Sequence, residues 1–166
     1  MSIFPTTILM ATDGSEEAQL AAKTAADLAK STSSVLHLIY VGYMPSIFYE
    51  SSGTMALDRD LRSRMEERAE EAARTKLREQ VQKIRDAGVE VAGIHTRVGF
   101  PDVEIVGLAG ELRAGLIVVG SRGLGPLRRA LMGSVSDSVV RHAHCPVLVV
   151  RQEKEDSAEH EADFLT

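Results

Sequence analysis

Residues 7–41 read TILMATDGSEEAQLAAKTAADLAKSTSSVLHLIYV, which is a short apolar run, an alanine-rich segment and a second apolar run. The two apolar runs, Thr7–Thr12 and Val35–Val41, show little alternation of polar and apolar side chains, as in strands that are covered on both faces of a parallel sheet. Between them, Ser15–Lys30 opens with a capping hydroxyl and two acids, which favour the start of a helix. The stretch therefore predicts a β-α-β unit.

The remainder of the chain repeats this alternation. Further strands are predicted at Val89–Val98, Leu116–Gly120 and Pro146–Arg151, and further helices at about Leu57–Asp86, from Pro101 onward, and at Ser134–His142. Five strands alternating with four helices, joined by right-handed crossovers, predict an α/β fold: a doubly wound, Rossmann-like, five-stranded parallel sheet with helices on both faces. In such a sheet a ligand binds at the carboxyl ends of the strands, where the direction of winding reverses.

Charge is distributed unevenly along the 166 residues. The chain has 19 Lys plus Arg and 24 Asp plus Glu, for a formal net charge of −5. The last fourteen residues, 153–166, hold six acids and one lysine, a sum of −5, so the preceding residues are neutral. We therefore expect a single domain over residues 1–151 and an acidic, disordered tail over residues 152–166. A neutral domain argues against binding to nucleic acid, which normally requires a basic face.

Other features of composition concern the cellular compartment. A single cysteine, Cys145, excludes an intramolecular disulfide, and the first residues lack a basic and apolar leader. No stretch approaches the roughly 18 apolar residues that a membrane-spanning helix needs. We expect a cytoplasmic protein that does not bind membranes.

The segment most informative about chemistry is residues 118–140, VVGSRGLGPLRRALMGSVSDSVV, which places a strand end, a glycine-rich loop and a helix start in order. Glycines let backbone N–H groups approach a ligand closely, and a helix start adds unpaired donors, so this order favours a phosphate-binding site. The loop lacks the Gly-Lys-Ser/Thr of a Walker A loop and the third glycine of a dinucleotide-binding loop. It has instead the spacing G-x2-G-x9-G-[ST].

With this spacing, set by Gly120, Gly123, Gly133 and Ser134, the chain resembles the universal stress protein family in its ATP-binding branch. The resemblance covers residues 5–151 and includes ILMATDGSEEA near the start and SVSDSVVRHAHCPVLVVR near the end. It implies that the adenosine part is held near the ends of the first two strands and the triphosphate by the glycine loop and helix start. The nucleotide-binding positions so implied are Ala11, Thr12, Asp13, Val41, Gly120, Arg122, Gly123, Gly133, Ser134, Val135 and Ser136.

The same resemblance implies a function and an assembly. It implies an ATP-binding stress-response or signalling protein that acts as a dimeric, nucleotide-dependent switch, with Mg²⁺ or Mn²⁺ bound through the phosphates. The homodimer would form through Val147 to Val150, an apolar strand that would otherwise leave an exposed sheet edge. The partner that reads the nucleotide state would be another, unidentified protein.

Several alternatives stay open at this point. The chain could be a slow ATPase or autokinase, or a dimeric interaction scaffold that binds no nucleotide; no catalytic residue is predicted. Asp13 could instead cap the helix that follows Gly14. Ser121 is expected to contact phosphate through its backbone or hydroxyl group rather than to act as a nucleophile.

Two groups of histidines are not assigned a ligand. The sequence His142-Ala-His144-Cys145 is interpreted as a polar helix exit rather than a metal site, because no segment supplies further ligands. His37 and His95 lie in strand patterns and are interpreted as packed or surface side chains.

Overall fold

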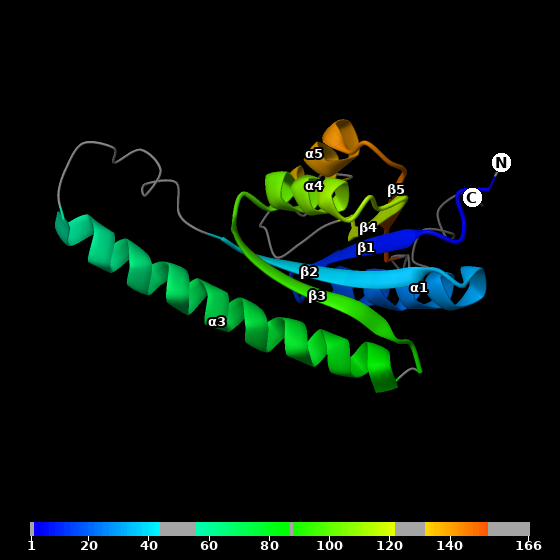
Figure 1. The fold of residues 1–166 in the computed structure, drawn as a ribbon, viewed down its shortest axis with the longest axis horizontal. Helices are drawn as coiled ribbons and strands as arrows, with labels where there is room; N and C mark the ends of the chain where they lie inside the picture. Colours follow the sequence, from blue (N-terminus) through cyan, green and yellow to red (C-terminus); the bar gives the residue numbers. More distant parts are fainter. Residues whose placement is uncertain (1, 44–55, 87, 122–131, 153–166) are drawn as a thin grey trace, which may run out of the picture.

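A single parallel sheet lies between two layers of helices in the computed structural model, which describes residues 2–43, 56–86, 88–121 and 132–152 (Figure 1). The elements in chain order are β1 (Thr7–Thr12), α1 (Glu16–Thr32), β2 (Val35–Tyr43), α3 (Ala56–Asp86), β3 (Val91–Gly99), α4 (Pro101–Glu111), β4 (Leu116–Gly120), α5 (Ser134–His142) and β5 (Val147–Val150). The doubly wound α/β fold predicted from the sequence is confirmed.

The strand order in the sheet is β3-β2-β1-β4-β5, and every neighbouring pair is parallel. β1 is central: from it the chain winds outward to β2 and β3 on one side, then returns to form β4 and β5 on the other. In register, Ile8 lies beside Leu116 and Met10 beside Val118. The carboxyl ends of β1 and β4 are therefore neighbours at the point where the winding reverses, as the sequence predicts.

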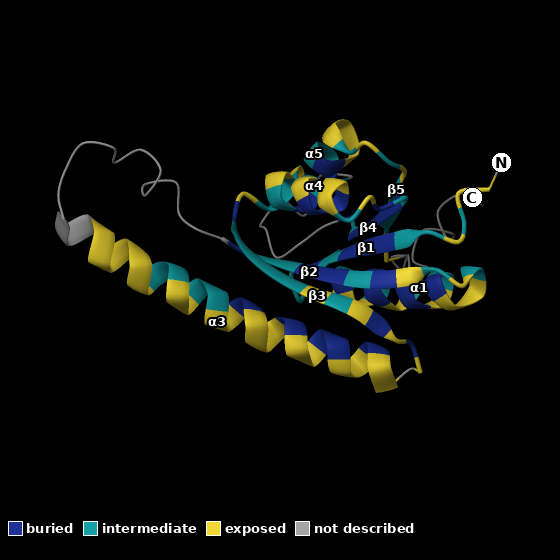
Figure 2. Cartoon of the chain, in the orientation of Figure 1, coloured by how far each residue is buried: buried dark blue, intermediate teal, exposed yellow. Residues whose placement is uncertain are grey.

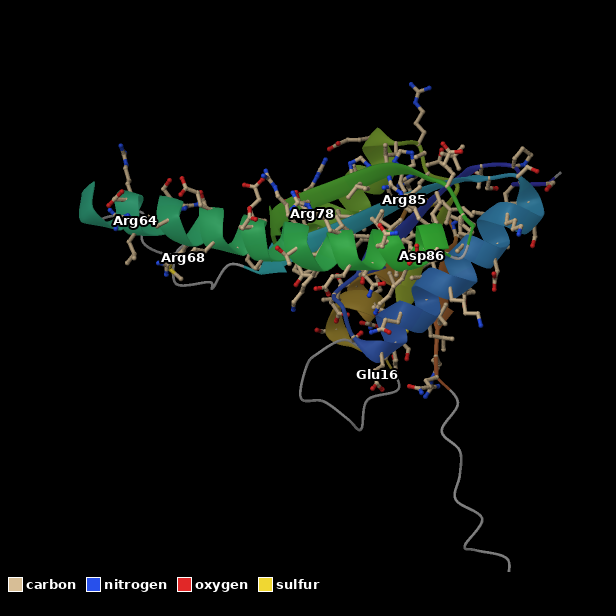
Figure 3. The ribbon with its side chains drawn as sticks, turned by 90° about the horizontal axis from the view of Figure 1, so that it is seen from below. Glu16, Arg64, Arg68, Arg78, Arg85 and Asp86 are labelled. Atoms are coloured by element: carbon tan, nitrogen blue, oxygen red, sulfur yellow. The ribbon has the colours of Figure 1, made fainter. Side chains whose placement is uncertain are left out.

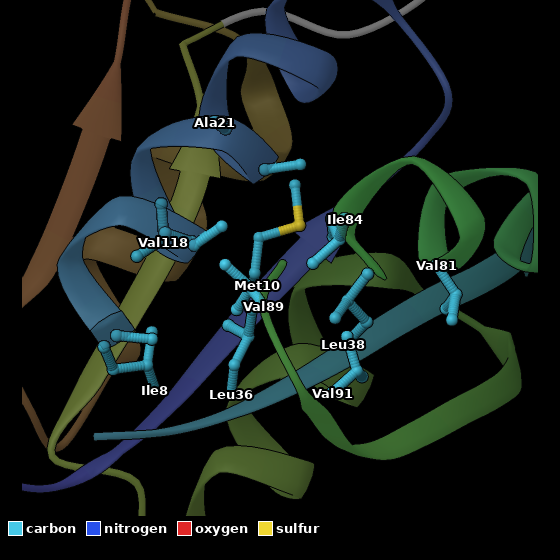
Figure 4. Packing of buried hydrophobic residues seen from close by; sticks show 14 of the residues in the cluster. Ile8, Met10, Ala21, Leu36, Leu38, Val81, Ile84, Val89, Val91 and Val118 are labelled. Atoms are coloured by element: carbon cyan, nitrogen blue, oxygen red, sulfur yellow. The ribbon is translucent and has the colours of Figure 1, made fainter. Parts of the chain in front are cut away.

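Each face of the sheet is covered by two helices. α1 and α3 pack on one face, where Ile8 and Met10 of β1 contact an alanine surface of α1 and aliphatic side chains of α3 (Figure 4). α4 and α5 pack on the opposite face, against Leu9 and Ile117. Ile8, Leu9 and Met10 are all fully buried although successive side chains point to opposite faces. Burial on both faces explains why these strands show no polar alternation.

α1 is the helix that leads away from the carboxyl end of β1. Ser15 is its N-cap, because Ser15 Oγ accepts a hydrogen bond from the backbone N–H of Ala18 at 3.2 Å. The helix continues to Thr32, two residues beyond the predicted end, and stops where Ser33 adopts a left-handed conformation with φ 55°. Its buried face consists of alanines, which let the helix axis lie close to the sheet: Ala18, Ala21, Ala22, Ala25, Ala26 and Ala29.

α3 consists of a packed half and an extended half. Ala73, Leu77, Val81 and Ile84 in its second half are buried, whereas Leu61 in its first half is 51% exposed. Because an apolar repeat of four residues overshoots a helical turn by about 40°, the apolar stripe turns away from the sheet toward the helix start. The first half extends past the sheet and is largely exposed (Figures 1 and 2), with Arg64 and Arg68 on it (Figure 3).

Several predicted strand boundaries differ from the structure. β2 ends at Tyr43 instead of Val41, and β3 ends at Gly99 instead of Val98. β3 begins at Val91 instead of Val89, because Gly88 has φ +80° and the N–H of Val89 bonds to the carbonyl of Ile84, which ends α3. β5 is shorter than predicted by one residue at each end. The predicted tail, except residue 152, and residues 44–55 of the predicted long loop lie outside the described residues. Over the described ranges, no helix is long and apolar enough to cross a membrane.

Candidate functional site

The turn between β1 and α1 holds the predicted aspartate at the carboxyl edge of the sheet. Asp13 Oδ1 accepts a hydrogen bond from the N–H of Ser15 at 2.9 Å, and Thr12 Oγ1 accepts one from the N–H of Gly14 at 3.2 Å. Gly14 has φ +81°, which favours glycine there. Asp13 therefore shapes the turn but does not cap the helix. The alternative that Asp13 is the N-cap is wrong, because Ser15 occupies that position.

The end of β4 and the start of α5 are joined by two short hydrogen bonds. Ser136 Oγ donates to the carbonyl oxygen of Gly120 at 2.6 Å, and the N–H of Gly133 donates to the carbonyl oxygen of Ser121 at 2.6 Å. The chain thus leaves β4 and returns to α5 at the same place. The first and third glycines of the spacing pattern, Gly120 and Gly133, lie together there. Arg122 and Gly123 lie outside the described residues.

The start of α5 has the features of an anion-binding helix terminus. Its N-cap residue is Gly133, which supplies no side-chain cap. Among the described residues, no side chain caps the N–H groups of the first helical turn, Ser134 to Ser136, at the positive end of the helix dipole. Asp137, the acid of this first turn, is paired with Arg141 at 2.9 Å. Donors arranged in this way fit the phosphate groups of a nucleotide.

Ser121, directly after β4, forms hydrogen bonds with other residues of the protein. It is 1% exposed, and its Oγ donates to Glu17 Oε2 at 2.6 Å. Its N–H donates to the carbonyl of Val150 at 2.7 Å, and its carbonyl accepts from Gly133. The expected contact between Ser121 and phosphate is therefore not supported. Instead this residue connects β4 to α1, β5 and α5.

Gly120 is required by the packing of α1 against the end of β4. A Cβ atom at this position would lie 3.2 Å from the backbone carbonyl carbon of Glu17 and 3.3 Å from the backbone nitrogen of Ala18. Backbone atoms of a helix cannot yield as a flexible side chain can. The glycine thus brings the first turn of α1 and the beginning of the glycine loop into direct contact.

The predicted positions on β1 and β2 lie at the same carboxyl edge. Thr12 pairs with Tyr40, and Val41 follows as the next residue of β2. Ala11 and Val41 are half-buried against the hydrophobic cluster beneath α4 and α5. The predicted positions that the structure describes come together at the carboxyl edge of β2, β1 and β4 and at the start of α5: Ala11, Thr12, Asp13, Val41, Gly120, Gly133, Ser134, Val135 and Ser136.

Lys76 of α3 is a cation beside this edge that the sequence did not indicate. Its Cδ lies 3.8 Å from the position that a Cβ of Gly14 would take, and its Nζ lies 5.9 Å from the centroid of the Tyr40 ring. That separation is within the range of a cation–π contact. In the sequence Lys76 is one of many charged residues on a long helix, so no spacing sets it apart.

A serine, an aspartate and a histidine meet between α4 and α5, but in an arrangement unsuited to nucleophilic catalysis. Ser138 Oγ donates to Asp102 Oδ2 at 2.6 Å. His142 Nδ1 lies 2.8 Å from the carbonyl oxygen of Ser138, which can only accept, so Nδ1 carries a proton. A ring nitrogen that already donates cannot take the proton of the serine as a catalytic base does.

Nothing in the described residues points to a protein-held metal. Residues 2–43, 56–86, 88–121 and 132–152 contain no group of three or more His, Cys, Asp or Glu side chains arranged to hold one. Burial raises the pKa of the Cys145 thiol, which keeps it protonated at neutral pH.

His37 and His95 form a pair that the sequence did not predict. His37 Nδ1 lies 3.0 Å from His95 Nε2, the ring centroids are 5.3 Å apart and the ring planes differ by 19°. At these distances the rings meet edge to edge through the two nitrogens. Burial lowers the pKa of both, and the charges of His37 and Arg97 lower that of His95 further, while Glu111 opposes this. His37 lies beside Gly93 on β3, well before the carboxyl edge.

Fold and site together define a doubly wound α/β protein with a glycine-flanked helix start at the switch point of its sheet. Residues 5–151 match the model of the universal stress protein family. The chain belongs to that family, and the family assignment from the G-x2-G-x9-G-[ST] spacing is confirmed.

Individual relatives agree in sequence and fold. A universal stress protein of Methanocaldococcus jannaschii is 37% identical over 153 residues, covering 90% of this chain and 84% of that protein. The structure of the universal stress protein UspA from Lactobacillus plantarum is 26% identical with a TM-score of 0.71, covering 89% of this chain and 99% of that one. A universal stress protein crystallised in complex with cAMP is 25% identical with a TM-score of 0.64, covering 90% and 99%.

Proposed function

We propose that this protein binds ATP at the carboxyl edge of β1 and β4, with Mg²⁺ or Mn²⁺ on the phosphates. The observation that carries the proposal is the start of α5. There Gly133 leaves the first-turn N–H groups without a side-chain cap, directly beside the end of β4. A relative crystallised with cAMP supports an adenine nucleotide as the ligand.

In this proposal, the start of α5 holds the phosphates of the nucleotide and the ends of β1 and β2 hold its nucleoside. The N–H groups of Ser134 to Ser136 would receive phosphate oxygens, where the helix dipole favours negative charge. Thr12, Asp13 and Val41 would receive the nucleoside, with Asp13 as an acceptor for ribose hydroxyl groups. A bound divalent cation would neutralise part of the phosphate charge.

Replacing Ser134 tests the phosphate position without harming the helix. Ser134 is exposed at the first position of α5. Ser134→Glu adds an acid that the helix dipole tolerates, so the melting temperature should hold or rise, while the carboxylate repels phosphate. We expect a loss of ATP affinity of about tenfold to hundredfold by isothermal titration calorimetry, from a like-charge repulsion at close range.

The uncharged variant Ser134→Gln is the matched control and should retain most of the affinity. Equal ATP binding by both variants would remove α5 from the site. A wild-type protein that carries no nucleotide after purification and binds none added would leave the nucleotide-free scaffold as the better description.

We also propose that the protein is a homodimer through β5, and that a protein partner distinguishes its loaded and empty states. β5 is an edge strand whose four residues, Val147 to Val150, are all half-buried. Within the described chain its outer side has no strand partner, which favours pairing with a second copy. A partner can respond to the nucleotide only through different affinities for the two states.

A further inference from the structure

A side-chain hydrogen bond between His37 and His95 joins β2 to β3, the outermost strand on one side of the sheet (Figure 1). His95 pairs in register with Ile39, and His37 lies two residues before Ile39 on β2, so both rings lie on the face that packs against α4. His37 Nδ1 and His95 Nε2 are 3.0 Å apart and the ring centroids are 5.3 Å apart, so the two nitrogens lie close to the line between the rings. The N–H of one ring therefore points directly at the lone pair of the other.

A bond of this geometry has room for one proton. A neutral imidazole carries a proton on one nitrogen and a lone pair on the other, so two neutral rings satisfy the bond. A first added proton binds to a nitrogen outside the bond and leaves the bond intact, now with a charged donor. A second added proton would place an N–H on both facing nitrogens, and two N–H groups cannot face each other across 3.0 Å.

Charged groups from β3 and α4 face the pair. Arg97 lies two residues after His95 on the same side of β3, and it donates to Glu104 and Glu111 of α4. One positive and two negative charges compensate one added proton on the pair but not a second. β1 and β2 contribute apolar side chains to this face, α5 packs beside β5, and α1 and α3 lie on the opposite face. The pKa of both rings is lowered, chiefly by burial, which agrees with a pair that resists double protonation.

The ring of His37 lies directly on the backbone of β3. A Cβ at Gly93, which pairs with His37, would overlap Nδ1 and lie 2.7 Å from Cε1 of that ring. Two charged rings repel each other, so a second proton would drive His37 out of this position. β3 would then be held to β2 by backbone hydrogen bonds without the additional bond between side chains.

We propose that the histidine pair is a pH-sensitive switch at the β3 edge, which holds one added proton at mildly acidic pH and separates when it receives a second. Once the rings have separated, β3 opens locally more readily than the central strands do. The switch does not depend on the proposed nucleotide site, because the pair lies well before the carboxyl edge of the sheet.

The test is an NMR titration of the ¹⁵N-labelled full chain from pH 8 to pH 4, in which the ring nitrogens report the protonation of each histidine. We expect the second proton to bind the pair about a hundredfold more weakly than the first, from unit charges on rings 5.3 Å apart at an effective dielectric constant near 20. His142 and His144 are exposed and serve in the same sample as references for rings that titrate separately.

His37→Asn and His95→Gln are the matched variants. The amide of asparagine can take the place of Nδ1, and the longer glutamine can place its amide where Nε2 lies, so each variant removes one titrating ring and keeps a polar group at the bond. Each remaining histidine should take up its proton at a higher pH than the second step of the wild type. Together the two variants then take up two protons over a pH range in which the wild type takes up one.

Amide hydrogen exchange of β3, relative to β1, measures the opening. In the wild type, the protection of the amides from Gly93 to His95 should fall about threefold to tenfold below the second step, as expected for the loss of one hydrogen bond. In either variant this protection should stay constant over the same range, because a single ring has no second charge beside it.

Separate steps in the wild type, with an acid loss of protection that both variants lack, support the switch. Uptake of two protons by the wild-type pair over the same pH range as His142 and His144 overturns it, even if a variant fails to fold. Equal protection of β3 in the wild type and in folded variants also overturns it. The result does not depend on whether the protein binds ATP.

Discussion

The two edges of the sheet are built differently. β3 has nine residues, among them His95 and Arg97, whereas the four residues of β5 are all aliphatic. Arg97 is anchored to Glu104 at 3.3 Å and Glu111 at 2.6 Å on α4. Charged side chains on an edge strand hinder pairing with another chain, and a short apolar strand does not. Among the described residues, the comparison favours the β5 edge over the β3 edge for the proposed contact with a second copy.

The largest expected effect is at the β5 edge. The carbonyls of Pro146 and Val150 accept hydrogen bonds from the β4 side, so the intervening Val147 and Val149 direct their backbone groups outward. Val149→Pro removes an outward N–H and leaves the ladder to β4 intact. We expect dimer affinity to fall about tenfold to hundredfold in analytical ultracentrifugation, from a lost hydrogen bond and steric hindrance.

Val149→Ala is the control for this variant, since it trims the same side chain and keeps the N–H. It should dimerise more tightly than Val149→Pro. If Val149→Pro remains dimeric with unchanged affinity, the dimer interface does not include the β5 edge, and the difference between the two edges does not explain dimerisation.

The second prediction concerns the packing of the β3 edge. A Cβ at Gly93 would overlap His37 Nδ1 and lie 2.9 Å from His95 Nε2, so Gly93 makes room for the histidine pair. Gly93→Ala should therefore lower the free energy of unfolding by about 1–3 kcal/mol through overpacking, measured by urea denaturation. The double variant Gly93→Ala with His37→Ala should recover much of the free energy of unfolding that Gly93→Ala loses, because the overlapping ring is gone.

Gly107→Ala on α4 is the comparison variant, and we expect it to raise the free energy of unfolding instead of lowering it. There the nearest atom to an added Cβ is Arg97 Nη1 at 4.0 Å, so alanine should stabilise the helix by up to about 1 kcal/mol. If Gly93→Ala were as stable as Gly107→Ala, the close packing of the histidine pair would be refuted.

The smallest expected effect is the pH dependence of the β3 edge. The native pKa values of His37 and His95 lie below the ordinary value of 6.5, so the unfolded chain binds protons more readily. The free energy of unfolding is therefore highest above pH 6.5, as far as this pair is concerned, and it decreases as the pH falls from 6.5 through the native pKa values. Thermal unfolding of wild type between pH 7.5 and 5.5 should show this loss.

Replacing both histidines by glutamine should weaken that pH dependence. Val147 to Val150 contain no titratable side chain, so dimer affinity should change little over the same range. A wild-type melting temperature that rises with acidification would contradict the sign derived for the pair.

Much of the fold follows from local patterns in the sequence. The buried strands can be recognised as apolar runs because both faces of β1 and β4 are covered. α5 has the predicted bounds, Ser134–His142. β3 was predicted to begin too early, since Val89 is as apolar as a strand residue but packs after the turn at Gly88. An apolar residue alone does not reveal whether its backbone is paired in a ladder.

The candidate site was accessible to sequence reasoning only where its residues belong to a spacing pattern. Gly120, Gly133 and Ser134 do so, and the structure places them together. Glu17 and Ser121 are far apart along the chain, and no pattern in either segment predicts the hydrogen bond between them. His37 and His95 meet through the register of β2 and β3, which includes a shift after Leu36 that no periodicity encodes.

The hydrogen bond between Gly133 and Ser121 has a consequence for the spacing of the glycines. It ties the residue that follows β4 to the N-cap residue of α5, so the first turn of α5 is positioned by the end of a central strand. Substitutions that displace either backbone group would move the N–H groups of Ser134 to Ser136 relative to the sheet. The spacing between Gly120 and Gly133 is therefore constrained from both ends by the fold itself.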